Sequence, residues 1–172
     1  LIGYVLVLVG VLVLHATGTL MVLLKLFTGL NPIVFLTKIR TAQMFAFSTA
    51  SSAATIPVTL RSVEERMGVN GSVASFTVPL GATINMDGTA MMQGVATVFI
   101  ANIYGVDLGV VGYLTVIVMA VLASIGTAAV PGVGLVMLTL VFSQVGLPVE
   151  GIGLILGVDR LLDMVRTAVN VT

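Results

Sequence analysis

The sequence predicts an all-α membrane protein with transmembrane helices, two oppositely oriented re-entrant helical hairpins and a discontinuous helix, arranged as an inverted repeat. Three observations support this fold class. Of the 172 residues, 58% are hydrophobic and 8% are charged, whereas a soluble domain has about 25% charged residues. Apolar runs recur along the chain, and some have the roughly 20 residues needed to cross a bilayer. Other runs are shorter and are interrupted by small polar residues, glycine and proline.

Residues 1–30 are predicted to form a transmembrane helix. The apolar run is long enough to cross with some tilt, and Gly29 followed by Asn31-Pro32 ends it. His15 lies in the middle of this span. Two interpretations stay open: a histidine that is hydrogen-bonded to a neighbouring helix, or a proton relay inside the membrane.

Residues 31–104 are predicted to form a first repeat. A re-entrant hairpin over 36–67 has two short apolar halves around the small polar tip "STASSAATIP". Neither half is long enough to span, so the tip turns back inside the membrane, where protein or water must cover its backbone. A transmembrane helix over 71–104 then follows. Its middle is broken by "NMDGT", so we expect helical halves at 72–84 and 89–104.

Residues 108–172 are predicted to form a second repeat of the same kind. A re-entrant hairpin over 108–146 turns at "SIGTAAVPGVG", and a polar transmembrane helix over 151–172 carries four charged residues. The order of hairpin and helix thus occurs twice. Interrupted apolar segments in corresponding positions of two halves are the best sequence indication of a transporter binding site.

The charged residues predict an orientation in the cell membrane. Five basic residues lie at the base of the first hairpin: Lys25, Lys38, Arg40, Arg61 and Arg66. Basic loops stay in the cytoplasm, so this base faces inward, and the base of the second hairpin, with no Lys or Arg, faces outward. Few basic residues exclude a nucleic-acid partner, and the absence of Cys excludes thiolate metal sites. Because both chain ends lack polar tails, we expect a piece of a longer polypeptide.

The last helix carries a polar stripe formed by Asp159, Asp163, Arg166 and Asn170, with Thr167 at its edge. Their spacing places them on one helix face, within about 60° of one another. One interpretation is a structural ion pair between Asp163 and Arg166, although buried pairs stabilise poorly. The other is a site for an amino acid with a second carboxylate. Arg166 would bind a carboxylate through its planar fork, and Asp163 would receive the ammonium group.

Asp87 is a carboxylate between apolar runs with no Lys or Arg close in sequence. Such a group either takes up a proton or binds a cation. Hard cations prefer oxygen ligands, and a broken helix exposes carbonyl oxygens. The oxygen ligands that we expect for a sodium ion are the side chains of Asn85 and Asp87, the carbonyls of Gly81, Thr83 and Met86, and the carbonyls of 124–127.

Four motifs together resemble the dicarboxylate/amino acid:cation symporters, which include the sodium-coupled glutamate and aspartate transporters. They are "STASSAATIPVT" (48–59), "NMDGT" (85–89), "ASIGTAAVPGVG" (123–134) and "GVDRLLDMVRTAVNV" (157–171). The resemblance covers essentially the whole chain and corresponds to the C-terminal half of the family fold. It implies a homotrimeric secondary symporter, not an enzyme, that moves an acidic amino acid with sodium through an elevator mechanism.

The resemblance also implies binding residues. The implied substrate contacts come from four segments. They are Ala50, Ser51 and Ser52 in the first hairpin; Thr89 in "NMDGT"; Val130, Pro131, Gly132, Val133 and Gly134 in the second hairpin; and Asp163, Arg166, Thr167 and Asn170 in the last helix. About three sodium sites are implied: Gly81, Asn85 and Asn170; Thr83, Ser124, Ile125 and Thr127; and Asn85, Met86 and Asp87. In this scheme Asp163 binds the amino group, and Arg166 binds the side-chain carboxylate.

Some features depart from the family pattern. Some members carry Arg at the first hairpin tip, where this chain has Ala50, and others place it in the last helix, where Arg160 is not firmly matched. A further sodium-ligating Asp would follow Thr172, and the scaffold segments that form the trimer are not in this sequence. Asp163 beside Arg166 favours aspartate or glutamate. The alternatives are a C4-dicarboxylate symporter, a proton-coupled variant or, less favoured, a channel.

Overall fold

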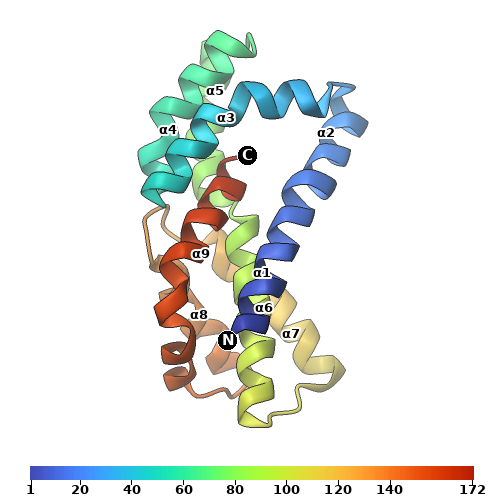
Figure 1. Cartoon of the computed structure of the whole chain (residues 1–172), viewed down its shortest axis with the longest axis vertical. Coiled ribbons are helices and arrows are strands. Elements are labelled where there is room, and N and C mark those ends of the chain that lie inside the picture. Colours follow the sequence, from blue (N-terminus) through green and yellow to red (C-terminus); the bar gives the residue numbers. More distant parts are fainter.

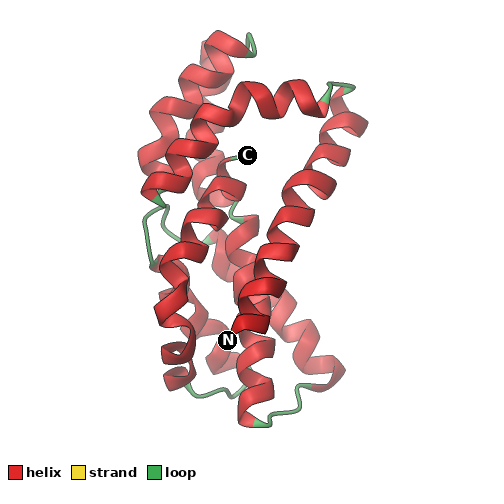
Figure 2. Ribbon diagram, viewed as in Figure 1, coloured by secondary structure: helices red, strands yellow, loops and turns green.

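The computed structural model describes all 172 residues, and every regular element in it is a helix, which confirms the predicted all-α class (Figures 1 and 2). The elements in chain order are α1 (Ile2–Leu14), a π-helical segment (His15–Thr19), α2 (Leu20–Thr28), α3 (Pro32–Thr49), α4 (Ser52–Arg61), a second π-helical segment (Ser62–Arg66), α5 (Gly71–Ile84), α6 (Asp87–Tyr104), α7 (Gly109–Ile125), α8 (Val133–Gln144), a 3₁₀ turn (Val149–Ile152) and α9 (Gly153–Val171).

The first helical rod runs without interruption from Ile2 to Thr28 and includes α1, the π-helical segment and α2. It is the one helix that is both long and apolar enough to cross a membrane by length and composition. Gly29 ends it with a φ of 70°, a left-handed conformation that glycine adopts without steric cost. Helices α7 and α8 are also apolar but shorter.

Two helical hairpins approach each other from opposite ends of the molecule (Figure 1). The first joins α3 to α4 at Ala50 and Ser51, and Ser51 caps α4 by accepting a hydrogen bond from the backbone N–H of Ala54. The second joins α7 to α8 through residues 126–132. Their tips touch, because the Ser51 hydroxyl and the Ala53 N–H both donate to the carbonyl oxygen of Ala129, at 3.0 and 3.1 Å.

A break of two residues, Asn85 and Met86, separates α5 from α6. Both residues have negative φ values, −94° and −116°, so the break needs no left-handed backbone. We expected the second half to begin at residue 89, whereas α6 begins at Asp87. Asp87 therefore lies in the first turn of α6, where the helix dipole favours a negative charge.

Gly88 is helical, and its lack of a side chain serves packing rather than the break. A Cβ atom at this position would lie 3.0 Å from both the carbonyl oxygen of Arg166 and the side-chain oxygen of Asn170. It would also lie 3.2 Å from a methyl group of Leu12. Gly88 thus allows α6 to approach α9 closely, which brings the residues after the break against the polar stripe.

One apolar core holds the helices around the site together. It is formed by buried residues of α1, α6, α7, α8 and α9, among them Tyr4, Leu8, Leu12, Met92, Ala96, Ile100, Val116, Leu138, Phe142 and Ile155. Outside this core, large apolar side chains are widely exposed, including Phe27, Phe76 and Val110. Apolar surface of this extent is typical of contact with lipid or with other protein segments.

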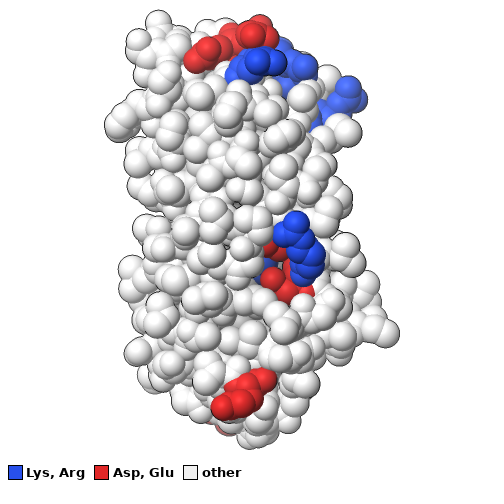
Figure 3. Space-filling view, turned by 90° about the vertical axis from the view of Figure 1, so that its left-hand side faces the viewer, with Lys and Arg blue, Asp and Glu red and all other residues white.

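Charged side chains gather in three zones along the long axis of the molecule (Figure 3). One end carries the basic residues of α2, α3 and α4 together with Glu64 and Glu65, and the other end carries Asp107 and Glu150. The zone between them coincides with a hollow on the face shown in Figure 3. The regions that separate the three zones are uncharged, as expected for a protein that spans a bilayer.

Candidate substrate and sodium site

A small cavity lies where the two hairpin tips meet α6 and α9. It is lined by Ala50, Ser52, Met86, Thr89, Thr127, Ala128, Ala129, Val130, Gly134, Asp163, Thr167 and Asn170. Eight of these residues belong to the substrate set expected from the sequence, and they come from four separate segments. The cavity measures about 20 Å³, which is room for about one water molecule. An amino acid would need the lining to move apart.

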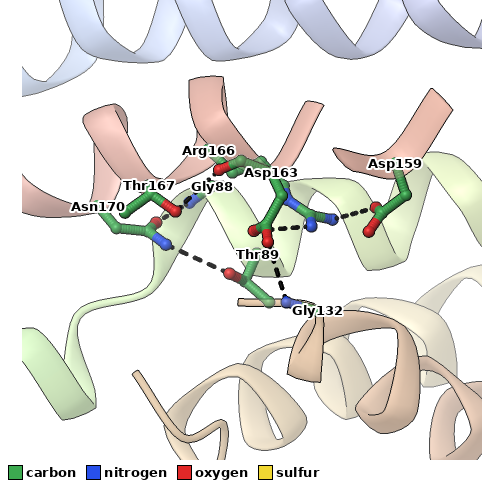
Figure 4. Close-up of polar contacts among 8 residues, drawn as sticks. All are labelled: Gly88, Thr89, Gly132, Asp159, Asp163, Arg166, Thr167 and Asn170. Carbon is green, nitrogen blue, oxygen red and sulfur yellow. Dashed lines mark hydrogen bonds and ion pairs between the residues drawn. The ribbon is translucent and has the colours of Figure 1, made fainter. Parts of the chain in front are cut away.

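Arg166 is the central charge of the site. Its side chain is 1% exposed and lies between two carboxylates, with Nη1 3.1 Å from Asp159 Oδ1 and Nη2 3.0 Å from Asp163 Oδ1 (Figure 4). Neither contact has the alignment of a hydrogen bond, and none of the guanidinium nitrogens has an aligned acceptor. The short distances give charge pairing, so a carboxylate ligand of Arg166 would compete with Asp159 and Asp163 for the planar fork.

Asp163 links the polar stripe to the second hairpin. Its Oδ2 atom accepts a hydrogen bond from the backbone N–H of Gly132 at 3.0 Å, while its Oδ1 atom faces Arg166. Gly132 has a φ of 80° and ends the loop that leads into α8. This contact fixes the hairpin tip directly over the carboxylate that we expect to receive an ammonium group.

Asn170 joins α9 to the first turn of α6. Its Oδ1 atom accepts from the N–H of Gly88 at 2.8 Å, and its Nδ2 atom donates to the hydroxyl of Thr89 at 3.3 Å (Figure 4). Thr167, one helical turn before it, donates to the carbonyl of Asp163. Asn170 therefore ties Thr89 to the polar stripe.

Asp87 has one ion-pair partner, His15, which lies 72 residues earlier in the chain. The distance from His15 Nε2 to Asp87 Oδ2 is 3.0 Å. The side-chain amide of Asn85 faces the other oxygen. With its nitrogen turned toward Asp87, it donates to Oδ1 at 2.7 Å. In the reverse orientation the amide oxygen and the carboxylate oxygen could both act as ligands of a cation between them. The side chains of Asn85 and Asp87 can thus supply oxygen ligands to a hard cation once the amide turns.

The other expected sodium ligands fall into separate groups. Gly81, Asn85 and Asn170 line a second cavity of about 210 Å³ between α3, α4, α5 and the end of α9. The hydroxyls of Thr83, Ser124 and Thr127 donate to carbonyls of their own helices, and Ile125 is exposed. The structure therefore brings the first group together around one space. In the second group, Thr127 lines the small cavity at the hairpin tips.

Comparison with known proteins decides the family. The sequence pattern of the sodium:dicarboxylate symporter family matches residues 1–172. The chain belongs to this family. It is 46% identical over 168 residues to an excitatory amino acid transporter of Caenorhabditis elegans, covering 98% of this chain and 33% of that protein. It is 46% identical over 160 residues to the human excitatory amino acid transporter 2, covering 93% of this chain and 28% of that protein.

A rat relative, excitatory amino acid transporter 4, is 42% identical over 168 residues, covering 98% of this chain and 30% of that protein. The chain thus spans about a third of the length of the curated relatives that it matches. The family and these relatives are transporters rather than enzymes, and sodium is part of the family description.

The structure confirms one of the two interpretations of His15, a histidine that is hydrogen-bonded to a neighbouring helix. The identity of its partner, Asp87 in α6, was not expected, because we considered only Lys and Arg close to Asp87 in sequence. Arg160 is exposed and forms no ion pair. Tyr4 and Gln93 are buried with polar atoms that lack hydrogen-bond partners. Gln93 follows Thr89 by one helical turn, and that spacing was the available signal.

Proposed function

We propose that this chain is the substrate-binding part of a sodium-coupled symporter for an acidic amino acid, aspartate or glutamate. The proposal rests mainly on one observation. The fully buried guanidinium of Arg166 lies 3.0 Å from Asp163, and Asp163 lines the small cavity together with the tip of the second hairpin. A carboxylate is the ligand that fits the planar fork of an arginine, and the carboxylate of Asp163 is placed to receive an ammonium group.

Binding would proceed by exchange of partners at the polar stripe. The substrate's side-chain carboxylate would take the donors of Arg166, and its ammonium group would approach Asp163. For that to happen the N–H of Gly132 must leave Asp163, so the second hairpin tip has to withdraw first. Thr89, Thr167 and Asn170 would then bind the remaining polar groups. In this order of steps, residues 126–132 are the part of the site that moves.

Sodium would act through the helix break. Asn85 and Asp87 lie four and two residues before Thr89, and Asn170 bonds both Gly88 and Thr89. A cation held by Asn85 and Asp87 fixes the start of α6, and this positions Thr89 for the substrate. Coupling therefore needs no distant pathway, because ion and substrate use the same few residues.

The wider expectations follow from the family resemblance and remain part of the proposal. They are about three sodium sites, two re-entrant hairpins in an inverted repeat, several membrane spans in the cell membrane, a homotrimer completed by scaffold segments, and an elevator movement of the site. The opposed hairpins with touching tips support an arrangement of this kind. The wide apolar surface supports lipid or scaffold contact.

The test is equilibrium binding of L-aspartate, succinate and L-alanine to the full-length protein, with sodium and with choline at equal ionic strength. We expect tight aspartate binding that requires sodium, with succinate and alanine each weaker by at least about 100-fold, because a ligand that leaves one buried charge without a partner loses about 3–5 kcal/mol. Succinate is the matched control for Asp163, since it lacks only the ammonium group.

Three results would contradict parts of the proposal. Equal binding of succinate and aspartate would show that Asp163 does not select the amine and would favour a C4-dicarboxylate symporter. If alanine bound as tightly as aspartate, Arg166 would not bind the side-chain carboxylate of the substrate. Aspartate binding that is the same in choline as in sodium would exclude sodium coupling and leave a proton-coupled variant.

A further inference from the structure

His15 lies in an irregular part of an otherwise regular helix. Between α1 and α2 the helix widens into a five-residue π-helical segment, His15–Thr19, that begins with this residue. Segments of this type inside α-helices are rare and occur often at functional sites. The His15 side chain is 13% exposed, and its Nε2 atom lies 3.0 Å from Oδ2 of Asp87. The widened turn thus directs its first side chain to the helix break.

The Asp87 carboxylate is contacted from two sides. His15 Nε2 lies 3.0 Å from Oδ2, and the amide nitrogen of Asn85, in its bonded orientation, lies 2.7 Å from Oδ1 and 3.3 Å from Oδ2. With the tautomer that has its hydrogen on Nε2, His15 donates to Oδ2, because a carboxylate accepts hydrogen bonds. His15 thereby fixes the plane of the carboxylate and leaves Oδ1 directed toward Asn85. A turn of the Asn85 amide would add its oxygen to Oδ1 as a second oxygen ligand for a cation.

The contact is not needed to hold the two helices together. Leu8 and Leu12 of α1 and Met92 and Ala96 of α6 belong to one apolar cluster, which joins these helices without any polar group. A partly buried polar pair is a poor way to add stability to such a contact. No Lys or Arg forms an ion pair with Asp87. The contact of His15 therefore acts on the orientation of the Asp87 carboxylate rather than on the packing of the two helices.

We propose that His15 is a positioning residue for sodium: it orients the Asp87 carboxylate from behind and thereby sets the affinity of the site formed with Asn85. The inference rests on the proposed function. Carboxylates that ligate metal ions are in turn hydrogen-bonded by outer groups, and loss of such an outer partner typically lowers metal affinity by about 10- to 100-fold. His15 acts through Asp87, so it changes the sodium requirement rather than substrate recognition.

The experiment compares His15→Leu, His15→Gln and His15→Asn in the full-length protein. Gln carries its amide nitrogen about as far from the backbone as His carries Nε2, while Asn is shorter by one methylene group and Leu has no donor. The readout is the sodium concentration that gives half of the sodium-induced rise in melting temperature, measured without substrate. Aspartate affinity at saturating sodium is measured in parallel. Thr17→Val is the control, because Thr17 lies in the same π-helical segment and bonds only to its own helix.

We expect the half-saturating sodium concentration to rise by about 10- to 100-fold in His15→Leu and to return most of the way in His15→Gln. Aspartate affinity at saturating sodium should change by less than about threefold. If His15→Leu is not stable enough to purify, His15→Asn replaces it and should require more sodium than His15→Gln.

Equal sodium requirements in the parent protein and His15→Leu would overturn the inference, as would equal requirements in His15→Gln and His15→Asn. In both cases the parent protein still responds to sodium, so the proposed function stands. A parent protein whose melting temperature and aspartate binding ignore sodium would overturn the proposed sodium coupling, and the role of His15 with it.

Discussion

Gly88 occupies the point where α6 comes nearest to α9. Any added carbon would press on the carbonyl of Arg166 and the amide of Asn170, and both belong to the polar stripe. Backbone atoms cannot turn aside as a flexible side chain can, so relief would have to come from a shift of the whole helix. A single missing methyl group thus sets the spacing of the candidate site.

We predict that Gly88→Ala lowers the stability of the purified protein by about 1–3 kcal/mol, the usual cost of overpacking. The matched control is Gly94→Ala on the same helix, where a Cβ would meet nothing within 4 Å. That substitution should be neutral or stabilising, because alanine is the better helix former. Melting temperatures of the two variants check the prediction, and equal losses in both would contradict it.

Single residues also show where sequence reasoning stops. The stripe of Asp159, Asp163 and Arg166 follows from helical spacing alone, and the structure pairs all three. His15 and Asp87 are separated by 72 positions. No local pattern joins them, because their contact depends on how α1 packs against α6. Charge pairs within one helix are thus predictable, whereas pairs between helices need the packed structure.

At the scale of elements, the two hairpins depend on each other. The tip of the first is stabilised by Ser51, whose hydroxyl caps α4 and also donates to Ala129 in the second. Ser51 is buried, so its hydroxyl cannot easily exchange these partners for water. Its loss would weaken both the start of α4 and the contact between the tips.

We predict that Ser51→Ala separates the tips more often. The chain contains no Cys, so a single reporter, Ala129→Cys, can be placed at the buried contact without altering the carbonyl that accepts both hydrogen bonds. Labelling of this thiol by a soluble reagent should be several-fold faster with Ser51→Ala, as expected from a capping loss of about 1 kcal/mol.

The control for this experiment is Ser48→Ala, because the Ser48 hydroxyl bonds only to its own helix. Labelling with Ser48→Ala should match the reporter alone. If both serine variants labelled at the same rate, the contact between the tips would not limit access.

The helices of the two hairpins could largely be predicted from the sequence pattern. Apolar runs, small polar tips and Gly or Pro interruptions mark the ends of α3, α4, α7 and α8 in the sequence. The break itself was predictable, because Asn and Gly favour left-handed or irregular backbone, and Asn85 and Met86 are irregular with negative φ. The predicted start of the second helical half, residue 89, was two residues late, because we assigned Gly88 to the break. Gly88 instead serves helix packing, which the sequence pattern does not show.

At the scale of the whole molecule, the distribution of charge defines a direction. Basic residues lie at the end formed by α2, α3 and α4, while Asp107 and Glu150 lie at the opposite end (Figure 3). Between these ends, charges occur only in the zone that contains the site. Such a distribution matches a bilayer with a basic cytoplasmic side.

We predict opposite accessibility for the two ends in intact cells. In the full-length protein, Glu150→Cys should react with an impermeant thiol reagent from outside, whereas Glu65→Cys should react only after permeabilisation. Both positions are exposed, and the pair between Arg61 and Glu65 lies on the surface, where its loss has little effect on stability. The reverse pattern would invert the proposed orientation.

The carbonyl of Ala129 receives two donors from the opposite hairpin, and this has a consequence for leakage. Both hydrogen bonds end on one carbonyl, so the withdrawal of either tip breaks both at once. Under the proposed transport function, each tip then depends on its remaining contacts to keep its own side closed. Variants that weaken these two hydrogen bonds are therefore the place to look for solute that leaks across the membrane without coupled transport.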